Sequence, residues 1–227
     1  MSKLALVGCG AIAKSFYLPA LSTMRSSFDA IYLVDPSELS LDAARRLVDG
    51  IPGRTFADLP ADISHVIVAS PNAAHFEHAS EALRRGAHVL VEKPFVLWPE
   101  EGARIITLAA ERGRIAAVNQ TRRVHPLARE LRARVRSGAL GRLRSVVHNE
   151  GSKLDWPFTS GAAFAPAAQR TGVIMDLGVH VLDFYQYVLE SAWTLRQARH
   201  DGFAGPEGLT QIELLAGDAP VSIRRSR

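Results

Sequence analysis

Short apolar runs alternate with amphipathic stretches through the first half of the chain. The apolar runs are rich in valine, isoleucine and leucine, which predicts strands buried on both faces. They lie at Lys3–Val7, Ala30–Val34, His65–Ala69, His88–Val91 and Ile115–Val118. Apolar positions recur at helical spacing between them, in Ala11–Met24, Leu39–Asp49, Ala73–Arg85 and Glu100–Arg112. This alternation predicts an α/β fold with a doubly wound parallel sheet.

The pattern changes after about residue 120, which predicts two domains, 1–120 and 121–227. A basic helical stretch, a strand-like run, a long irregular stretch and a second helix are followed by three further strand-like pieces. The two helical stretches lie at Pro126–Ser137 and Met175–Leu189, and the irregular stretch at Glu150–Thr171. The strand-like pieces lie at Leu143–His148, Thr194–Arg199, Thr210–Leu215 and Val221–Arg224. We expect an α+β domain here, with Trp156 in the irregular stretch as a possible platform for a sugar or a packing residue.

Composition and charge narrow the class of protein. Hydrophobic residues make up 47% of the 227 residues and charged residues 22%, as in ordinary globular proteins. The net charge of +4 comes from 27 basic and 23 acidic residues that are interleaved, without a nucleic-acid recognition motif, so we expect no nucleic-acid partner. No apolar run approaches the roughly 20 residues of a membrane span, so no membrane partner is expected.

Cysteine and histidine usage points away from a metal site or a disulfide framework. Cys9 is the single cysteine, and the histidines offer no third ligand at useful spacing, so we expect no metal. Met1-Ser2-Lys3 leads straight into the first strand without a signal-peptide pattern. The expectation is a cytoplasmic protein.

A glycine-rich turn joins the first predicted strand to the first helix. Gly8-Cys9-Gly10-Ala11-Ile12-Ala13 fits the pattern Gly-x-Gly-x-x-Gly/Ala, in which the first glycine allows a tight turn and the second lets a pyrophosphate approach. The helix that follows presents N–H groups and a positive dipole end to phosphates. We expect Cys9 to fill space between the glycines and not to act as a nucleophile.

Asp35 follows the second strand, 25 residues beyond Gly10. A carboxylate at this position accepts both ribose hydroxyls of NAD and repels the 2′-phosphate of NADP, so NAD is expected and NADP is less favoured. The alternative is that Asp35 caps a turn formed with Pro36 and Ser37.

Polar residues also follow two later strands. Ser70-Pro71-Asn72-x-x-His75 comes after His65–Ala69, and Glu92-Lys93-Pro94 comes after His88–Val91. Ligands of open α/β sheets gather at the carboxyl ends of the strands. Lys93 is one of only four lysines; it either holds a substrate oxygen or is a surface lysine in a turn. Asn72 is also placed to cap the third helix.

The segment Met175–Leu189 carries a polar stripe. On a helix, Asp176, His180, Asp183 and Tyr187 share one face, while Leu177, Val181, Phe184 and Val188 share another and are expected in the core. The stripe is either the solvent side of an amphipathic helix or a site. It contains no lysine, arginine or glutamate, which favours a site. Gly178 costs helix stability, which a close approach to a ligand or another backbone would explain.

These segments together resemble the glucose–fructose oxidoreductase / inositol dehydrogenase (Gfo/Idh/MocA) family. The resemblance is collinear over about residues 1–190 and rests on the glycine-rich turn, Ser70–His75, Gly86–Pro94, Gly138–Arg142 and Asp176–Asp183. It implies an N-terminal Rossmann domain and a C-terminal α+β domain built on an open, mostly antiparallel sheet, which often mediates homo-oligomerisation. It also implies an NAD(P)-dependent enzyme acting on sugars, inositols or related polyols.

The resemblance further implies roles for individual residues. Lys93 would hold and polarise the reacting oxygen, His180 would be the acid or base, and Asp176 would support the pair. Ser70, Asn72, His75 and Glu92 would line the cofactor together with Lys93. Imidazole suits proton transfer near neutral pH, and a fixed ammonium stabilises alkoxide charge.

Two other classes of function stay open. One is an NAD-binding regulator without turnover, and the other is an NAD-assisted glycosidase or lyase that regenerates its cofactor internally. The second domain is also shorter than the resemblance implies, so the sequence is either truncated or has a shortened sheet. An open sheet edge or face would invite a partner subunit.

Overall fold

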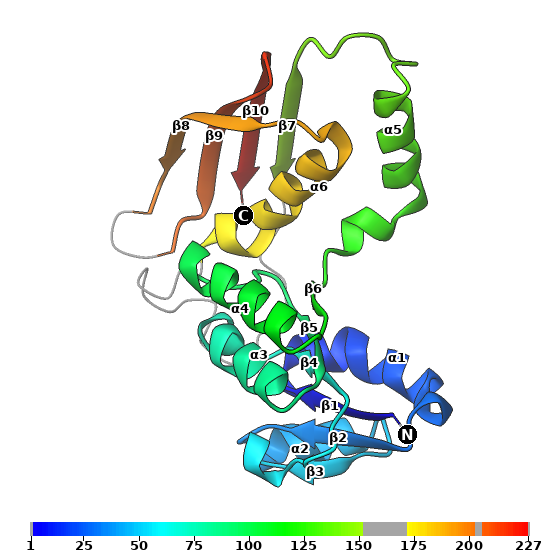
Figure 1. Ribbon diagram of the computed structural model, residues 1–227. Helices are drawn as coiled ribbons and strands as arrows, with labels where there is room; N and C mark the ends of the chain where they lie inside the picture. The colour runs from blue at the N-terminus through cyan, green and yellow to red at the C-terminus, as the bar shows by residue number, and fades with distance from the viewer. Residues whose placement is uncertain (1, 152–171, 203–205, 227) are drawn as a thin grey trace. The chain divides into compact units, whose positions relative to one another are not determined.

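The computed structural model describes residues 2–151, 172–202 and 206–226. Two compact units make up the chain, one ending at Asn119 and the other beginning at Gln120 (Figure 1). Most of the predicted irregular stretch, including Trp156, lies outside the described residues.

The first unit is built on a six-stranded sheet in the order β3-β2-β1-β4-β5-β6. Every strand pairs in parallel with its neighbours. The strands are β1 (Lys3–Val7), β2 (Ala30–Val34), β3 (Ile51–Gly53), β4 (His65–Val68), β5 (His88–Val91) and β6 (Ala116–Val118). The order reverses between β1 and β4, which is the topological switch point where doubly wound folds bind their ligands. The predicted fold of this unit is confirmed.

Helices cover both faces of this sheet (Figure 1). They are α1 (Leu18–Thr23), α2 (Glu38–Arg45), α3 (His75–Arg84) and α4 (Pro99–Glu111). Short 3₁₀ turns of this unit lie at Arg25–Ser27, Phe56–Asp58 and Asn72–Ala74, and another at Thr121–Val124 begins the second unit. The α1 helix is preceded by a π-helical turn, η1 (Ala13–Tyr17). Helix α3 begins at His75 without a side-chain cap, so the predicted capping role of Asn72 is wrong.

Alternate strand residues enter opposite cores. Leu4 and Leu6 pack with α1 and α2, whereas Ala5 and Val7 pack with α3 and α4. Successive side chains of a strand point to opposite faces, so an uninterrupted apolar strand fills both layers. Each fully buried leucine or isoleucine contributes about 1.5–3 kcal/mol relative to an exposed one.

The edge strand β3 was not predicted from the sequence. It is only three residues long and contains Pro52 and Gly53, two residues that are unfavourable inside strands. Pairing with Tyr32, Leu33 and Val34 of β2 fixes it as a strand.

The second unit has a four-stranded sheet in the order β7-β10-β9-β8. Its elements are α5 (Pro126–Arg136), β7 (Val146–Gly151), the π-turn η8 (Ile174–Gly178), α6 (Val179–Leu189), β8 (Trp193–His200), β9 (Leu209–Ala216) and β10 (Ala219–Ser226). Strands β10 and β9, and β9 and β8, pair antiparallel, and β7 pairs parallel with β10. The predicted open, mostly antiparallel sheet is confirmed.

Helix α6 lies against one face of this sheet (Figure 1). Val181 of α6 packs with Ile212 and Leu214 of β9 and with Val221 and Ile223 of β10. The partly buried residues of the same core include three from the helix, Leu182, Tyr185 and Leu189. Val181 and Val188, two of the four predicted core members, are the buried residues of α6, whereas Leu177 and Phe184 are only partly buried.

Candidate active site

The predicted cofactor residues gather at the carboxyl edge of the first unit's sheet. Backbone hydrogen bonds continue past the strand ends and hold the turns together: the Gly8 N–H donates to Val34 O at 2.8 Å, and the Glu92 N–H donates to Val68 O at 2.9 Å. Gly8, Asp35, Ser70, Glu92 and Asn119 therefore each lie within two residues of a strand end on one edge. This is the edge where ligands of such sheets bind.

The two glycines of the first turn meet different requirements. Gly8 has a φ of +95°, and a Cβ atom there would lie 2.5 Å from Ala69 O and Ser70 N, so the fold itself requires glycine. A Cβ atom on Gly10 would meet no protein atom within 4 Å. The space above Gly10 therefore suits a ligand that approaches the backbone, and the residues of this turn fit the pyrophosphate of a dinucleotide.

Asp35 is joined to the glycine-rich turn. Its Oδ2 accepts from the Cys9 N–H at 2.8 Å, and its Oδ1 accepts from the Ser37 N–H at 2.9 Å. The turn considered as the alternative role of Asp35 is therefore present. Each carboxylate oxygen has a second lone pair, so these bonds leave capacity for ribose hydroxyls.

Cys9 is fully buried between the glycines. Burial, followed by the nearby Asp35 carboxylate, raises the pKa of the Cys9 thiol to about 12. The thiol is therefore protonated at neutral pH, which agrees with the expected space-filling role.

Two histidines of α3 hold the turn after β4. His75 is 1% exposed, and its Nδ1 and Nε2 lie 2.7 Å from Pro94 O and 2.9 Å from Ser70 O. His78 Nδ1 lies 2.8 Å from Ser70 Oγ. These contacts tie the turns after β4 and β5 to one helix. The placement of His75 favours a supporting role over the predicted direct contact with a cofactor.

Glu92 is 9% exposed, and both of its carboxylate oxygens accept hydrogen bonds. Oε1 accepts from the Tyr17 hydroxyl at 2.6 Å and from Asn119 Nδ2 at 2.8 Å, and Oε2 accepts from the Lys93 N–H at 3.1 Å. This placement also favours support of the adjoining turn over the predicted cofactor contact. Tyr17 and Asn119 were not identified from the sequence; only the strand-end position of Asn119 offered a signal.

Asp176 and His180 lie at the start of the helix that packs on the second unit's sheet. Asp176 is part of the π-turn η8, and His180 is the second residue of α6. Such turns are rare and occur frequently at functional sites. Packing within the turn gives a further reason for Gly178, because a Cβ atom there would meet the side chain of Ile174 at 2.4 Å, and the expected approach of a ligand stays a prediction.

The other half of the polar stripe belongs to helix packing. Asp183 accepts from Arg123 Nε at 2.8 Å, and the guanidinium groups of Arg123 and Arg132 lie 5.5 and 4.5 Å from the Tyr187 ring centroid. Arg132 also pairs with Glu190. The stripe thus divides into Asp176 and His180 at the start of the helix and a basic-aromatic contact farther along it.

A second polar cluster in this unit was not predicted. Glu150 accepts from Arg122 at 3.3 Å and forms an ion pair of 3.0 Å with Arg225, and its Oε2 lies 3.1 Å from His148 Nε2. The other ring nitrogen of His148 lies 3.2 Å from the Tyr185 hydroxyl. The cluster joins β7, β10 and α6, so it stabilises the sheet and its covering helix.

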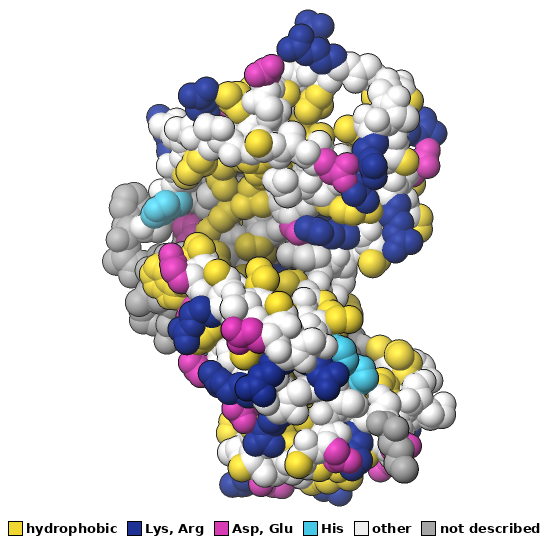
Figure 2. Space-filling view, in the orientation of Figure 1, with side chains coloured by type: hydrophobic (Ala, Val, Ile, Leu, Met, Phe, Trp, Pro, Cys, Tyr) yellow, Lys and Arg dark blue, Asp and Glu magenta, His cyan; other side chains and the backbone are white. Residues whose placement is uncertain are grey.

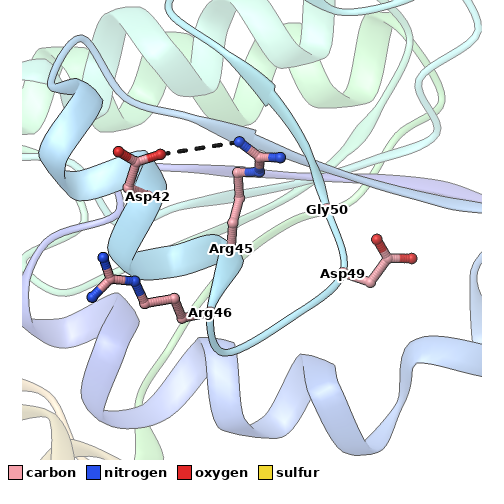
Figure 3. A pocket seen from close by; sticks show the side chains of 5 residues that line it. All are labelled: Asp42, Arg45, Arg46, Asp49 and Gly50. Carbon is pink, nitrogen blue, oxygen red and sulfur yellow. Dashed lines mark ion pairs between the residues drawn. The ribbon is translucent and has the colours of Figure 1, made fainter.

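A surface hollow of about 340 Å³ lies away from these residues. Asp42, Arg45, Arg46, Asp49 and Gly50 line it (Figure 3). Gly50 immediately precedes β3, so the hollow is at the amino edge of the parallel sheet, opposite the edge where ligands bind. An ion pair of 4.0 Å between Asp42 and Arg45 accounts for part of its polar lining.

Surface charge and metal-binding groups add little to this picture. On the face shown in Figure 2, basic and acidic side chains are intermixed over both units. Among the described residues, no group of three or more His, Cys, Asp or Glu side chains is arranged to hold a metal ion. None of the helices within these residues is long and apolar enough to cross a membrane.

Comparison with known families shows to which family the chain belongs. Residues 2–120 match the model of the oxidoreductase family Gfo/Idh/MocA, NAD-binding Rossmann fold, and residues 128–210 match the C-terminal domain of the same family. The chain belongs to the Gfo/Idh/MocA family. The resemblance seen in its motifs is thereby confirmed, and the first unit is the family's NAD-binding domain.

Individual members of the family are moderately similar to this chain. Glucose-6-phosphate 3-dehydrogenase of Bacillus subtilis is 31% identical over 205 residues, covering 88% of this chain and 57% of the relative. D-glucoside 3-dehydrogenase of Escherichia coli is 27% identical over 193 residues, covering 82% and 54%. The chain therefore spans little more than half the length of these two relatives.

A solved structure shows the same fold. The structure of a 3-ketoreductase from Actinomadura kijaniata, in complex with NADP and TDP-benzene, aligns with a TM-score of 0.84 at 22% sequence identity. The alignment covers 99% of this chain and 70% of that protein.

Proposed function

We propose that the protein is an NAD-dependent oxidoreductase that transfers a hydride between the nicotinamide and a hydroxyl or keto carbon of a sugar or sugar derivative. The observation that carries this proposal is the position of Lys93, which follows β5 at the same sheet edge as Gly10 and Asp35. Relatives named as sugar 3-dehydrogenases support the substrate class.

The cofactor is assigned to the turns at that edge. Gly8, Gly10, Ala11, Ile12 and Ala13 would hold the pyrophosphate, since the turn is open above Gly10 and a helix begins at Ala11. Asp35 would accept the hydroxyls of the adenosine ribose, which favours NAD over NADP.

The remaining cofactor residues come from the turns after β4 and β5. Ser70, Asn72 and Lys93 would face the nicotinamide half of the dinucleotide. His75 and Glu92 would act mainly by holding those turns, because both are buried and their polar atoms already contact neighbouring groups.

Three side chains would carry the proton chemistry. NAD, when bound, accepts the hydride from the carbinol carbon during oxidation. The Lys93 ammonium would stabilise negative charge on the substrate oxygen, and His180 would take the hydroxyl proton and return it in the reverse direction. Asp176, which precedes His180 by one turn, would orient and electrostatically support this pair.

Turnover of a panel of sugars, sugar phosphates and nucleotide sugars tests the proposal. Lys93→Ala and His180→Ala should each lower kcat by about 100-fold or more, since positioned acid–base groups contribute about that much. Lys3→Ala and His200→Ala are matched controls, and NADH binding is measured separately for all four variants. If Lys93→Ala and His180→Ala retain the parent rate, the assignment is wrong.

The panel also separates the two other classes of function. NADH binding without turnover of any substrate would favour a non-catalytic regulator. Product formation without net change in NADH would favour a glycosidase or lyase that recycles its cofactor.

A further inference from the structure

The Tyr17 side chain joins two parts of the cofactor edge that are far apart in sequence. Tyr17 closes the π-turn η1, which lies at the start of the helix that follows the glycine-rich turn, and it is 8% exposed. Its hydroxyl donates to Glu92 Oε1 at 2.6 Å and accepts from Asn119 Nδ2 at 2.8 Å. Asn119 Nδ2 also lies 2.8 Å from Glu92 Oε1. We call these three residues the Tyr17–Glu92–Asn119 triad.

The triad holds a buried carboxylate with directional donors. A carboxylate removed from water is costly unless hydrogen bonds replace its hydration, and hydrogen bonds to a charged group are stronger than those between neutral groups. The phenol remains a donor at neutral pH, because burial and the adjacent Glu92 raise the pKa of Tyr17. Tyr17, which lies at the start of the helix that follows the glycine-rich turn, therefore fixes the orientation of the Glu92 carboxylate.

Glu92 passes this constraint to the lysine turn. Its second oxygen accepts from the Lys93 N–H at 3.1 Å, so the carboxylate is bonded at one end to Tyr17 and at the other to the Lys93 backbone. The next residue, Pro94, is held through its carbonyl oxygen by His75 at 2.7 Å. Lys93 thus extends from a backbone that is fixed on both sides.

We propose that Tyr17 is a positioning residue for Lys93: acting through Glu92, it sets the place of the lysine relative to the helix that receives the cofactor. The inference rests on the proposed function, in which Lys93 polarises the substrate oxygen. The π-turn supports it, because Tyr17 is the last residue of this turn and π-turns are frequent at functional sites.

Tyr17→Phe tests the proposal, since it removes one hydroxyl and keeps the ring. We expect kcat to fall about 10- to 100-fold, the effect of a small misplacement of a catalytic group, while the KM for cofactor and substrate changes less than about twofold. Tyr32→Phe is the matched control, because Tyr32 is a partly buried tyrosine of the same unit. A normal kcat in folded Tyr17→Phe would overturn the proposal.

A double-mutant cycle shows whether Tyr17 acts through Glu92. In a Glu92→Ala background, which removes the acceptor of the Tyr17 hydroxyl, Tyr17→Phe should change kcat by less than about twofold, since the two residues act as one unit. Fully multiplicative losses would mean that Tyr17 affects kcat independently of Glu92, which would overturn the proposal. Thermal unfolding of each variant separates such a loss from unfolding.

Chemical labelling of lysine gives a readout independent of turnover. With an amine-selective reagent and peptide mass spectrometry, the Lys93 rate should rise about threefold or more in Tyr17→Phe, because release of Glu92 frees the turn. The Lys3 rate should stay constant, and Tyr32→Phe should leave both unchanged. If the parent turns over no sugar, the proposed function fails, yet an unchanged Lys93 rate would still overturn the role given to Tyr17.

Discussion

The Cys9 N–H donates a hydrogen bond of 2.8 Å to Oδ2 of Asp35. This bond joins the glycine-rich turn to the end of β2, 26 residues apart in the chain. The group proposed to bind the ribose is therefore oriented by the turn proposed to bind the pyrophosphate. A substitution at Asp35 can therefore remove the negative charge while it keeps the hydrogen bond from the Cys9 N–H.

Asp35→Asn removes the charge and leaves an oxygen that can accept from Cys9. We expect the Kd for NADH to rise about tenfold, since a charged hydrogen bond contributes about 1.5–3 kcal/mol. The Kd for NADPH should rise less or fall, because the 2′-phosphate no longer meets a negative charge. Fluorescence titration with both nucleotides measures the ratio, with Asp42→Ala as a surface control. Unchanged NADH affinity would remove Asp35 from the cofactor site.

Gly8→Ala and Gly10→Ala should have opposite consequences. At Gly8, the positive φ and the 2.5 Å approach to Ala69 and Ser70 predict a loss of about 2 kcal/mol or more in the free energy of unfolding. At Gly10, the added methyl group meets no protein atom, so stability should change little while NADH binding weakens at least about tenfold. Denaturant unfolding and NADH titration of both variants provide the comparison. Similar NADH affinity in Gly10→Ala and the parent would contradict the proposed pyrophosphate site.

Acid should destabilise the protein through its buried histidines. Burial lowers the pKa of His75 below the ordinary value of 6.5, and burial followed by the neighbouring His75 lowers that of His78. The unfolded chain then binds protons first, so this part of the stability is complete above about pH 6.5 and is lost as the pH falls toward the folded-state values.

Denaturant unfolding between pH 7.5 and 5 measures this loss. In His75→Gln, which cannot titrate, the fall in the free energy of unfolding should be shallower than in the parent. His200→Gln, at an exposed position of β8, is the control. Equal slopes in His75→Gln and the parent would show that His75 does not contribute.

Self-association through the sheet of the second unit is a further proposal, motivated by its uncovered strand residues. Val147 of β7 is 70% exposed, although it lies within a strand. Val147→Glu should reduce the molecular mass measured by light scattering if this sheet joins subunits, because a buried unpaired charge opposes association. Leu39→Glu, at an exposed site of α2, should leave the mass unchanged. A monomeric parent, or an unaltered mass in Val147→Glu, would refute this arrangement.

The hydrophobic pattern of the sequence predicted the strands that are buried on both faces of the sheet. Lys3–Val7, Ala30–Val34 and His88–Val91 were predicted with the bounds that the structure has, because each is a continuous apolar run with no competing pattern. Strand β7 begins at Val146 instead of Leu143, since its pairing with Val221 of β10 sets the start. That pairing partner lies too far along the chain for local hydrophobicity to reveal it.

The two π-turns mark the limit of sequence reasoning for the site. A uniform helical period placed Asp176, His180, Asp183 and Tyr187 on one stripe, but the wider turn η8 and the arginines of neighbouring elements divide it. The partner of Tyr17 is 75 residues away, so no local pattern connects it with Glu92. Motifs pointed to the residues that are proposed to bind a ligand, whereas the contacts of Tyr17 and Asn119 with Glu92 are evident only in the folded chain.

The contact of Arg123 and Arg132 with Asp183 and Tyr187 has a consequence for which positions of this protein can be varied. Beyond its first turn, one side of α6 packs on the sheet, and another side contacts these two arginines. Randomised libraries aimed at new substrates should therefore leave positions 183 and 187 intact. They should concentrate diversity at positions 175, 177 and 179, which are half-buried, and keep Asp176, Gly178 and His180.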